Sequence, residues 1–440
     1  MCSYFYATLF LFLAAARAAE RRGEPAEHFG GDGTTALSSA AAATSLLEFT
    51  PTGTLVQTIG LPVADAGTTL ALTETGNSTA DASLTRSADG RYLILPGYNA
   101  APGTLTLANT TAATTNRLIG RIAADGSINT TTRISDAFSG TTSTGANIRG
   151  AASVNGSAFY VVGNNTGVVY ATLGNTGAST TISTGTPTNL RTINIVGGNL
   201  YVSSASGTTQ GVAQVGTGLP TTAGQAIAPL AGFPTTSGPS PYAFFFTDQS
   251  TTVPGSDVLY VADDRATDGG IQKWSLVGNT WTLNGTIAGG AVRGLAGSVS
   301  GTTVTLLASS TGSLYAVTDN AGYNAAPSTT ALPAAIATAG TNYAFRGLAP
   351  APVATALATR TEATQDQLAL YPNPAQDILT ISLATGSAAG HLAEVRDLLG
   401  RPVRTATLPA SGQLSLSGLA AGSYLLTVDG TLTRRISKVD

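Results

Sequence analysis

The sequence is poor in the residues that most often carry chemistry. Its 440 residues include 1 cysteine and 2 histidines, and only 10% are charged, with a net charge of −3. A weakly acidic chain of this kind has no basic face for nucleic acid, so we expect no nucleic-acid partner. The single thiol, Cys2, precedes an apolar N-terminal run and would leave with it. The mature chain then has neither disulfides nor cysteine metal sites.

Long apolar runs are also lacking, except at the N-terminus. Residues 4–16 have the length of a signal-peptide core, and Ala16-Arg17-Ala18 offers a small-residue cleavage site, so 1–18 is predicted to be a signal peptide. A short membrane anchor is the alternative, because the positive charges follow the apolar run. Beyond it, no run approaches the roughly 18–20 residues that span a bilayer, so we expect no membrane span in the mature chain.

Hydrophobic residues (42%) and 52 glycines dominate the composition instead. That is too apolar for disorder and typical of an all-β chain of short strands and tight turns. A unit of a short strand, a glycine turn and a tyrosine-containing apolar strand recurs through the middle of the chain. Its copies begin at positions 82, 149, 191, 242, 293 and 346. A three- to four-stranded unit repeating at roughly 40–50 residues is typical of a β-propeller.

The last copy of the unit has no room for partner strands before Pro350. A hairpin predicted over residues 45–59 could pair with it and close the ring, which gives six blades. Seven blades are the alternative if the long first unit contains an extra sheet, and an elongated β-sandwich array is the alternative architecture. The predicted parts are a signal peptide at 1–18, an N-terminal segment at 19–44, a β-propeller-like domain at 45–352, a linker at 353–367 and a C-terminal domain at 368–440.

The C-terminal stretch has its own pattern, with about seven short strands in roughly 70 residues, as in a small immunoglobulin-like β-sandwich. Its distinctive residues are Tyr371, Pro372, Asn373, Pro374, Asp377, Val395, Asp397, Gly400, Arg401, Val403, Leu419, Gly422, Tyr424, Leu426, Lys438 and Val439. In their order and spacing, the stretch resembles the C-terminal sorting domain of type IX secretion. Only the terminal Asp440 departs from the pattern, which usually ends in an apolar or basic residue.

The resemblance to a sorting domain implies a route and a partner. It implies recognition by the type IX secretion machinery and passage across the outer membrane. The domain would then be removed, and the product released or attached to surface lipopolysaccharide. The resemblance concerns the tail alone and says nothing about the cargo.

The predicted propeller offers little for catalysis. His28 lies in the N-terminal segment and His391 in the tail, so Thr34 to Pro352 contains neither histidine nor cysteine. That excludes a Ser-His-Asp or Cys-His nucleophile there and leaves no histidine ligands for zinc.

The densest acidic group of the propeller is Asp263, Asp264 and Asp268, in a glycine-bounded loop after an apolar strand. No cofactor is predicted, with Ca²⁺ at these oxygens as the alternative. The other interpretation of this loop is a solvated turn with local hydrogen bonds.

One arginine recurs at the start of four repeats: Arg149, Arg191, Arg293 and Arg346. Propeller symmetry would place them in a ring around the central channel. Converging guanidinium groups there could bind a uronic acid, sulfate or phosphate group. Alternatively, each arginine ties a loop carbonyl or a neighbouring blade. Repetition is expected of a structural consensus, which favours the second interpretation.

The two tryptophans, Trp274 and Trp281, flank a Gly278-Asn279 hairpin turn. They are expected to pack in the blade, with stacking on a sugar as the alternative.

These observations predict an exported β-propeller, on the cell surface or released, with a non-enzymatic binding or adhesion role. The expected partner is an extracellular polysaccharide or another anionic ligand. The rival is a carboxylate-dependent polysaccharide hydrolase or lyase, for which no two carboxylates are visibly set apart. A structural surface protein is the second alternative.

Overall fold

The computed structural model describes residues 25–183, 185–354, 368–384, 386–397, 400–430 and 432–440. The chain forms two compact units, Met1–Ala354 and Thr355–Asp440. The predicted signal peptide and most of the predicted linker (355–367) lie outside the described residues. Within the described residues, no helix is long and apolar enough to cross a membrane.

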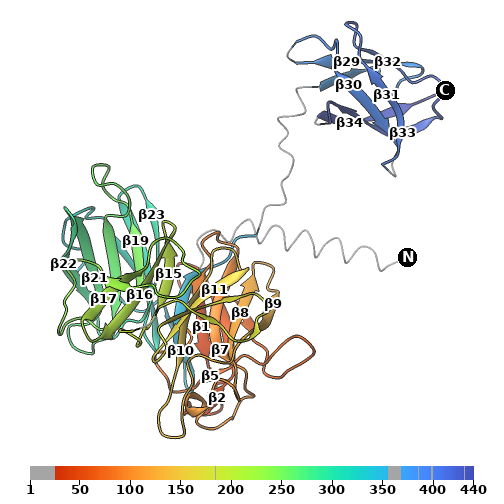
Figure 1. The fold of residues 1–440 in the computed structure, drawn as a ribbon. Coiled ribbons are helices and arrows are strands. Elements are labelled where there is room, and N and C mark those ends of the chain that lie inside the picture. The colour runs from red at the N-terminus through yellow and green to blue at the C-terminus, as the bar shows by residue number, and fades with distance from the viewer. Residues whose placement is uncertain (1–24, 184, 355–367, 385, 398–399, 431) are drawn as a thin grey trace. The chain divides into compact units, whose positions relative to one another are not determined.

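The first unit is built from six sheets of four or five strands, taken in order along the chain (Figure 1). Blade 1 contains β6 (Thr85–Arg86), β7 (Tyr92–Tyr98), β8 (Arg117–Ala123), β9 (Ile128–Ile134) and, parallel to β9, β13 (Thr176–Gly177). Blade 2 contains β10 (Ile148–Ala152), β11 (Ala158–Gly163), β12 (Val168–Thr172) and β14 (Thr180–Thr181). Blade 3 contains β15 (Ile193–Val196), β16 (Asn199–Ser206), β17 (Thr209–Val215) and β18 (Ile227–Pro229).

The remaining sheets complete this series. Blade 4 contains β19 (Pro241–Thr247), β20 (Val258–Asp263), β21 (Gly270–Val277) and β22 (Thr280–Ala288). Blade 5 contains β23 (Gly294–Ser300), β24 (Thr303–Ser309), β25 (Ser313–Asp319) and β26 (Ala337–Thr338). Blade 6 contains β27 (Ala344–Pro350), β1 (Pro25–Gly30), β3 (Thr44–Phe49) and β4 (Leu55–Gly60). Outside the blades lie a two-stranded sheet, β2 (Ala41–Ala42) with β5 (Glu74–Thr75), and the 3-10 turn η1 (Leu107–Asn109).

Neighbouring blades contact each other all the way round. Contacts join β6 to β10, β10 to β15, β16 to β19, β19 to β23, β23 to β27, and β27 back to β6. This closed ring confirms the predicted β-propeller. Its blades number six, because the long first repeat supplies one sheet and a loop instead of a second sheet. Closure also removes the exposed inner edge that an open array of sheets would leave.

The blades follow directly from local sequence. Every residue of β20 is buried, as expected of a short apolar strand covered on both faces. Between β15 and β16 the chain reverses through Gly197 and Gly198, with φ of 55° and 75°. A two-residue hairpin turn of this kind needs positive φ at both central positions, which glycine adopts without strain.

The closing blade differs from the prediction in one strand. The hairpin of β3 and β4 belongs to the sheet of β27, but it does not pair with β27 directly. Strand β1 lies between them, with Ala26 opposite Ala349 on one side and Glu48 on the other. The N-terminal segment therefore belongs to the propeller, which begins before the predicted boundary at residue 45.

The second unit is the small two-sheet sandwich predicted for the tail. One sheet contains β28 (Leu368–Tyr371), β29 (Ile378–Leu383) and β32 (Gln413–Ser415). The other contains β30 (Leu392–Arg396), β31 (Pro402–Thr407), β33 (Gly422–Val428) and β34 (Leu432–Lys438). Alternate residues of both sheets, such as Leu379, Val395 and Leu426, form one buried core.

Candidate functional site: the channel of the propeller

The first strands of the blades line the channel and run side by side in the same direction. The amide of Ser83 donates to the carbonyl of Arg149, and further along the same strands Ala88 donates to Ser153. All four recurring arginines lie where these strands begin, which defines one end of the channel. We call it the arginine end.

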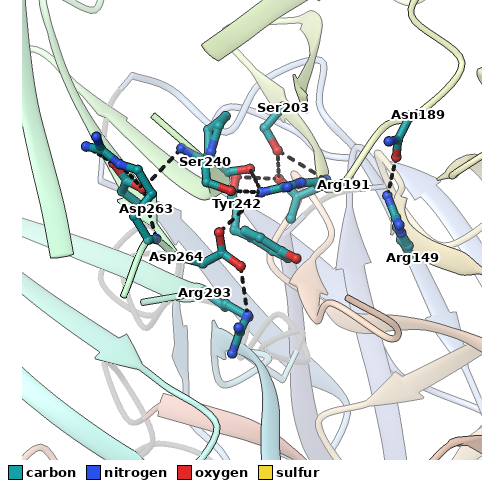
Figure 2. A network of polar contacts seen from close by, with 12 residues as sticks. Arg149, Asn189, Arg191, Ser203, Ser240, Tyr242, Asp263, Asp264 and Arg293 are labelled. Carbon is teal, nitrogen blue, oxygen red and sulfur yellow. Dashed lines mark hydrogen bonds and ion pairs between the residues drawn. The ribbon is translucent and has the colours of Figure 1, made fainter. Parts of the chain in front are cut away.

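Two of the arginines share one carboxylate. Arg191 Nη1 lies 3.5 Å from Asp264 Oδ1, and Arg293 Nε lies 3.3 Å from Asp264 Oδ2. The guanidinium carbons of Arg191 and Arg293 lie 4.4 and 5.7 Å from the centre of the Tyr242 ring. Figure 2 shows Asp264 and Tyr242 between the two arginines. Arg191 also donates to Ser240 Oγ at 2.6 Å, so it ties blade 3 to blade 4.

Arg149 makes a separate contact, visible at the side of Figure 2. Its Nη1 donates to Asn189 Oδ1 at 2.5 Å and to the carbonyl of Leu190 at 3.2 Å, in the segment that leads into blade 3. Burial lowers the pKa of this guanidinium. Its polar partners in the described residues are thus neutral groups of the neighbouring blade.

Arg346 forms a buried ion pair. Its Nε lies 3.2 Å from Glu74 Oε1, its Nη2 donates to the carbonyl of Gly76, and both charged side chains are almost fully buried. Burial raises the pKa of Glu74 to about 7, although Arg346 acts in the opposite direction. Each recurring arginine therefore bonds to a neighbouring blade or loop, as the structural interpretation expects. Anion binding by the four stays a prediction, and these contacts already use donors on each of them.

The expectation of a propeller without histidine is wrong, because His28 belongs to β1. Its ring is fully buried, with Nδ1 3.0 Å from the carbonyl of Ala82 and 3.7 Å from Glu74 Oε2. Burial, and then the charge of Arg346, lower the pKa of His28 to about 3. A neutral ring without access to solvent cannot exchange protons with a substrate, so this histidine adds no catalytic base to the channel.

The structure does not bring the three predicted calcium ligands together. Asp263 is buried and accepts from Arg265 and Gln272, while Asp264 faces the arginines. Asp268 is exposed, and its carbonyl accepts from Arg265. Among the described residues, no group of three or more His, Cys, Asp or Glu could hold a metal ion. In the described residues, the acidic loop is organised around the side chain of Arg265, which contacts Asp263 and the carbonyl of Asp268.

The tryptophans are not available for stacking on a sugar. Trp274 and Trp281 are 4% and 7% exposed, in the apolar layer between blades 3 and 4. Trp274 stacks on Phe233 with ring centres 4.1 Å apart, and Trp281 meets Phe246 edge-on at 5.7 Å. Both rings therefore pack blades together, as their first interpretation expected.

Beyond the arginine end, the first strands enclose a cavity of about 230 Å³, which we call the channel cavity. Five of the six first strands line it: Ser83–Ala88, Thr192–Ile195, Ala243–Phe245, Leu295–Gly297 and Leu348–Pro350. Hydroxyl and amide groups, such as Thr192 and Asn194, alternate with apolar ones, such as Phe245. A cavity that combines an apolar wall with a few polar groups is the usual form of a small-molecule site.

Arg86 is the functional candidate that sequence reasoning missed. It is the single charged side chain among the residues that line the channel cavity. The corresponding stretches of the other four lining strands carry no charge. A charged residue at this position of one repeat is visible in the sequence. It lies in one of the weaker copies of the repeat, however, where the sequence pattern does not align the strands with those of the other copies.

The tail motif residues have local structural roles. Asn373, in the Tyr371-Pro372-Asn373-Pro374 segment, donates to the carbonyl of Arg435 at 3.1 Å and accepts from the amide of Ser437 at 2.9 Å. The segment is thereby fixed against β34.

A second group of tail residues organises turns and strand ends. Asp397 accepts from the amide and side chain of Arg401, and Gly400, with φ of 84°, donates to the Asp397 carbonyl. The hydroxyl of Tyr424 donates to the carbonyl of Ala420 at 2.8 Å. At the strand end, Gly422 pairs with Lys438, whose ammonium donates to the carbonyl of Val439 at 2.7 Å.

The comparison with protein families confirms the identity of this tail. Residues 369–439 match the secretion system C-terminal sorting domain. The chain is therefore an exported cargo of type IX secretion, and its localisation is secreted or at the cell surface. No curated protein matches the chain.

Several solved structures are similar to the chain at low identity. PorZ, a bacterial surface component of the type IX secretion system of Porphyromonas gingivalis, is 13% identical, with 94% of this chain and 58% of PorZ covered and a TM-score of 0.40. A chain of the nidogen/laminin complex is 12% identical, covering 75% of this chain and 100% of that one, with a TM-score of 0.43. A putative 6-phosphogluconolactonase from Bacteroides uniformis is 12% identical, covering 90% and 100%, with a TM-score of 0.40. This chain thus spans 58% of the length of PorZ, and similarities at this level carry no argument about function.

Proposed function

We propose that the protein is a binding protein of the cell exterior and that the channel cavity is its ligand site. One observation carries this proposal: five blades contribute to a cavity of about 230 Å³ in which hydroxyl, amide and aromatic groups lie side by side. Saccharides present alternating hydroxyl groups and apolar ring faces, which match such a lining. The ligand class is therefore a carbohydrate or a polar extracellular molecule of similar size.

The composition of the cavity favours binding over hydrolysis. A glycosidase places two carboxylates about 5–10 Å apart on either side of the scissile bond. No Asp, Glu or His occurs among the residues that line the channel cavity. The acids that the sequence made candidates, Asp263 and Asp264, are engaged with Arg265 and with the arginine end.

The proposal includes a route to the ligand. A signal peptide would take the chain across the inner membrane, and the sorting domain would take it across the outer membrane. Removal of the sorting domain would leave the propeller released or attached to the surface. An attached propeller that binds a polymer would act as an adhesin.

Binding of the exported protein to a panel of neutral and acidic glycans tests this function, with product analysis on the same samples. We expect binding without new reducing ends or unsaturated sugars. Asn194→Ala should weaken binding, because Asn194 lines the channel cavity, whereas Asn155→Ala, in an exposed turn of blade 2, should not. Product formation would replace the proposal with the hydrolase or lyase, and neither binding nor product would favour a structural surface protein.

A further inference from the structure

The charge of the channel cavity is unbalanced. Arg86 lies in β6 and lines the cavity, where no lining residue is acidic. Its Nη1 donates to the carbonyl of Ala351 at 3.2 Å, and it belongs to no ion pair between described residues. Its side chain is partly buried, and burial lowers the pKa of the guanidinium, although arginine stays charged at physiological pH. A half-desolvated cation without an anion is costly unless a ligand or water compensates it.

The hydroxyl groups that precede Arg86 belong to the wall of the cavity and are not open to it. Ser83, three residues before Arg86 on the same edge of blade 1, lines the same cavity. Its hydroxyl oxygen is buried and has no hydrogen-bond partner among the described residues. An oxygen this buried is out of reach of a ligand in the cavity, and it lies beside Gly150 of blade 2. The hydroxyl of Thr85 is also turned to blade 2, where it donates to the carbonyl of Ala151 at 2.6 Å, so Arg86 is the group of this stretch that is left for a ligand.

We propose that the channel cavity binds the anionic group of a small ligand through Arg86. The inference rests on the proposed function, in which this cavity is the ligand site. A guanidinium group recognises carboxylate and sulfate oxygens in pairs, so the ligand is a sugar acid or a sulfated sugar. The cavity is smaller than the roughly 300–1,000 Å³ of sites for drug-sized ligands, which limits the bound part to about one saccharide unit.

The experiment measures binding of glucose, glucuronate and glucose 6-sulfate to the exported protein by calorimetry at low and high salt. We expect one of the anionic sugars to bind about 10- to 100-fold more tightly than glucose, with the advantage reduced by salt. The two anionic sugars distinguish a carboxylate from a sulfate ligand. Arg86→Gln should abolish the advantage, because glutamine keeps a donor for the Ala351 carbonyl and loses the charge. Arg86→Lys should restore it in part, because an ammonium group keeps the charge without the paired geometry.

The matched control is Arg91→Gln, in the same blade. Arg91 pairs with Asp89 at 2.6 Å and does not line the channel cavity, so its loss should leave binding unchanged. Equal affinity for glucose and both anionic sugars would overturn the role of Arg86 and leave the proposed function intact. Failure of all sugars, neutral and anionic, to bind the wild-type protein would overturn both. An anionic preference that survives Arg86→Gln would also overturn the inference.

Discussion

The two ends of the channel use arginine in opposite ways. At the arginine end, four guanidinium groups from four blades contact carboxylates, hydroxyl groups and carbonyls of neighbouring blades or loops. In the channel cavity, the guanidinium of Arg86 donates to one neutral carbonyl, and none of the described residues that line the cavity is acidic. The recurring arginines thus join one blade to the next. Arg86 has no equivalent in the other blades, and it is the arginine that we propose for the ligand. An arginine that recurs in several repeats is therefore more readily explained by a structural role than by ligand binding.

Among the variants that test the difference between the two ends, we expect Arg346→Met to have the largest effect on stability. The substitution leaves Glu74 buried without its cation, which should cost about 3–5 kcal/mol of unfolding free energy. Urea unfolding followed by tryptophan fluorescence measures it, because both tryptophans lie in the propeller. The double variant with Glu74→Gln should recover part of the loss. A loss below about 1 kcal/mol would mean that the arginine end does not hold the blades together.

A pH dependence from Glu74 is expected next in size. Its pKa is about 7 in the folded protein, against roughly 4.3 for an unfolded chain, so the folded state binds more protons between these values. Stability should therefore fall as the pH rises from about 4.5 to 7, by up to about 3 kcal/mol. Glu74→Gln should remove this fall.

The difference between wild type and Glu74→Gln is the quantity to compare, because His28 acts in the opposite direction. Its pKa of about 3 makes stability fall as the pH drops from roughly 6.5 to 3, in both proteins. The raised pKa of Asp81 acts in the same direction as that of Glu74 and also persists in the variant. Parallel pH profiles of the two proteins would contradict the assignment to Glu74.

Arg149→Ala should have a smaller effect. It removes two hydrogen bonds to the segment before blade 3, at a cost of about 1–2 kcal/mol, and should leave ligand binding unchanged. The anion-binding interpretation of the recurring arginines predicts the reverse, with lost binding and an unchanged melting temperature. Calorimetry and thermal unfolding of the same sample decide between them.

Arg86→Gln should change stability least, within about 0.5 kcal/mol, because it removes a charge that has no anionic partner in the described residues. Thermal unfolding without ligand checks this. If Arg86→Gln lost as much stability as Arg149→Ala, Arg86 would have the same structural role as the recurring arginines, which would contradict the comparison.

The parts of the fold that could be predicted from the sequence are those formed by residues close together in the chain. The glycine turns and tyrosine-containing strands predicted six blades, because each blade buries its own apolar strands before it meets its neighbours. The tail was predicted for a similar reason: Asp397, Gly400 and Arg401 form a turn whose hydrogen bonds lie within a few residues of one another.

The strand that was missed depends on contacts distant in sequence. Residues 25–30 carry Glu27 and His28, which suggest a solvated segment, yet both side chains are fully buried. Strand β1 pairs with β27 and β3, His28 lies against Ala82 and Glu74, and Glu27 lies near Ser309 of blade 5. These contacts are distant in the chain, so the local sequence does not reveal the burial. Arg86 was missed because what distinguishes it is that no acidic residue lines the cavity around it, and the sequence does not show which residues line the cavity.

The closing blade also determines the order in which the molecule can fold. Strand β1 pairs residue 26 with residue 349, so the ring cannot close until nearly the whole propeller has formed or emerged. Contacts this distant in sequence carry a large loop-closure entropy and are made late, which slows folding. The propeller therefore closes only when its first and last strands, which are more than 300 residues apart in the chain, are both present to pair in one sheet.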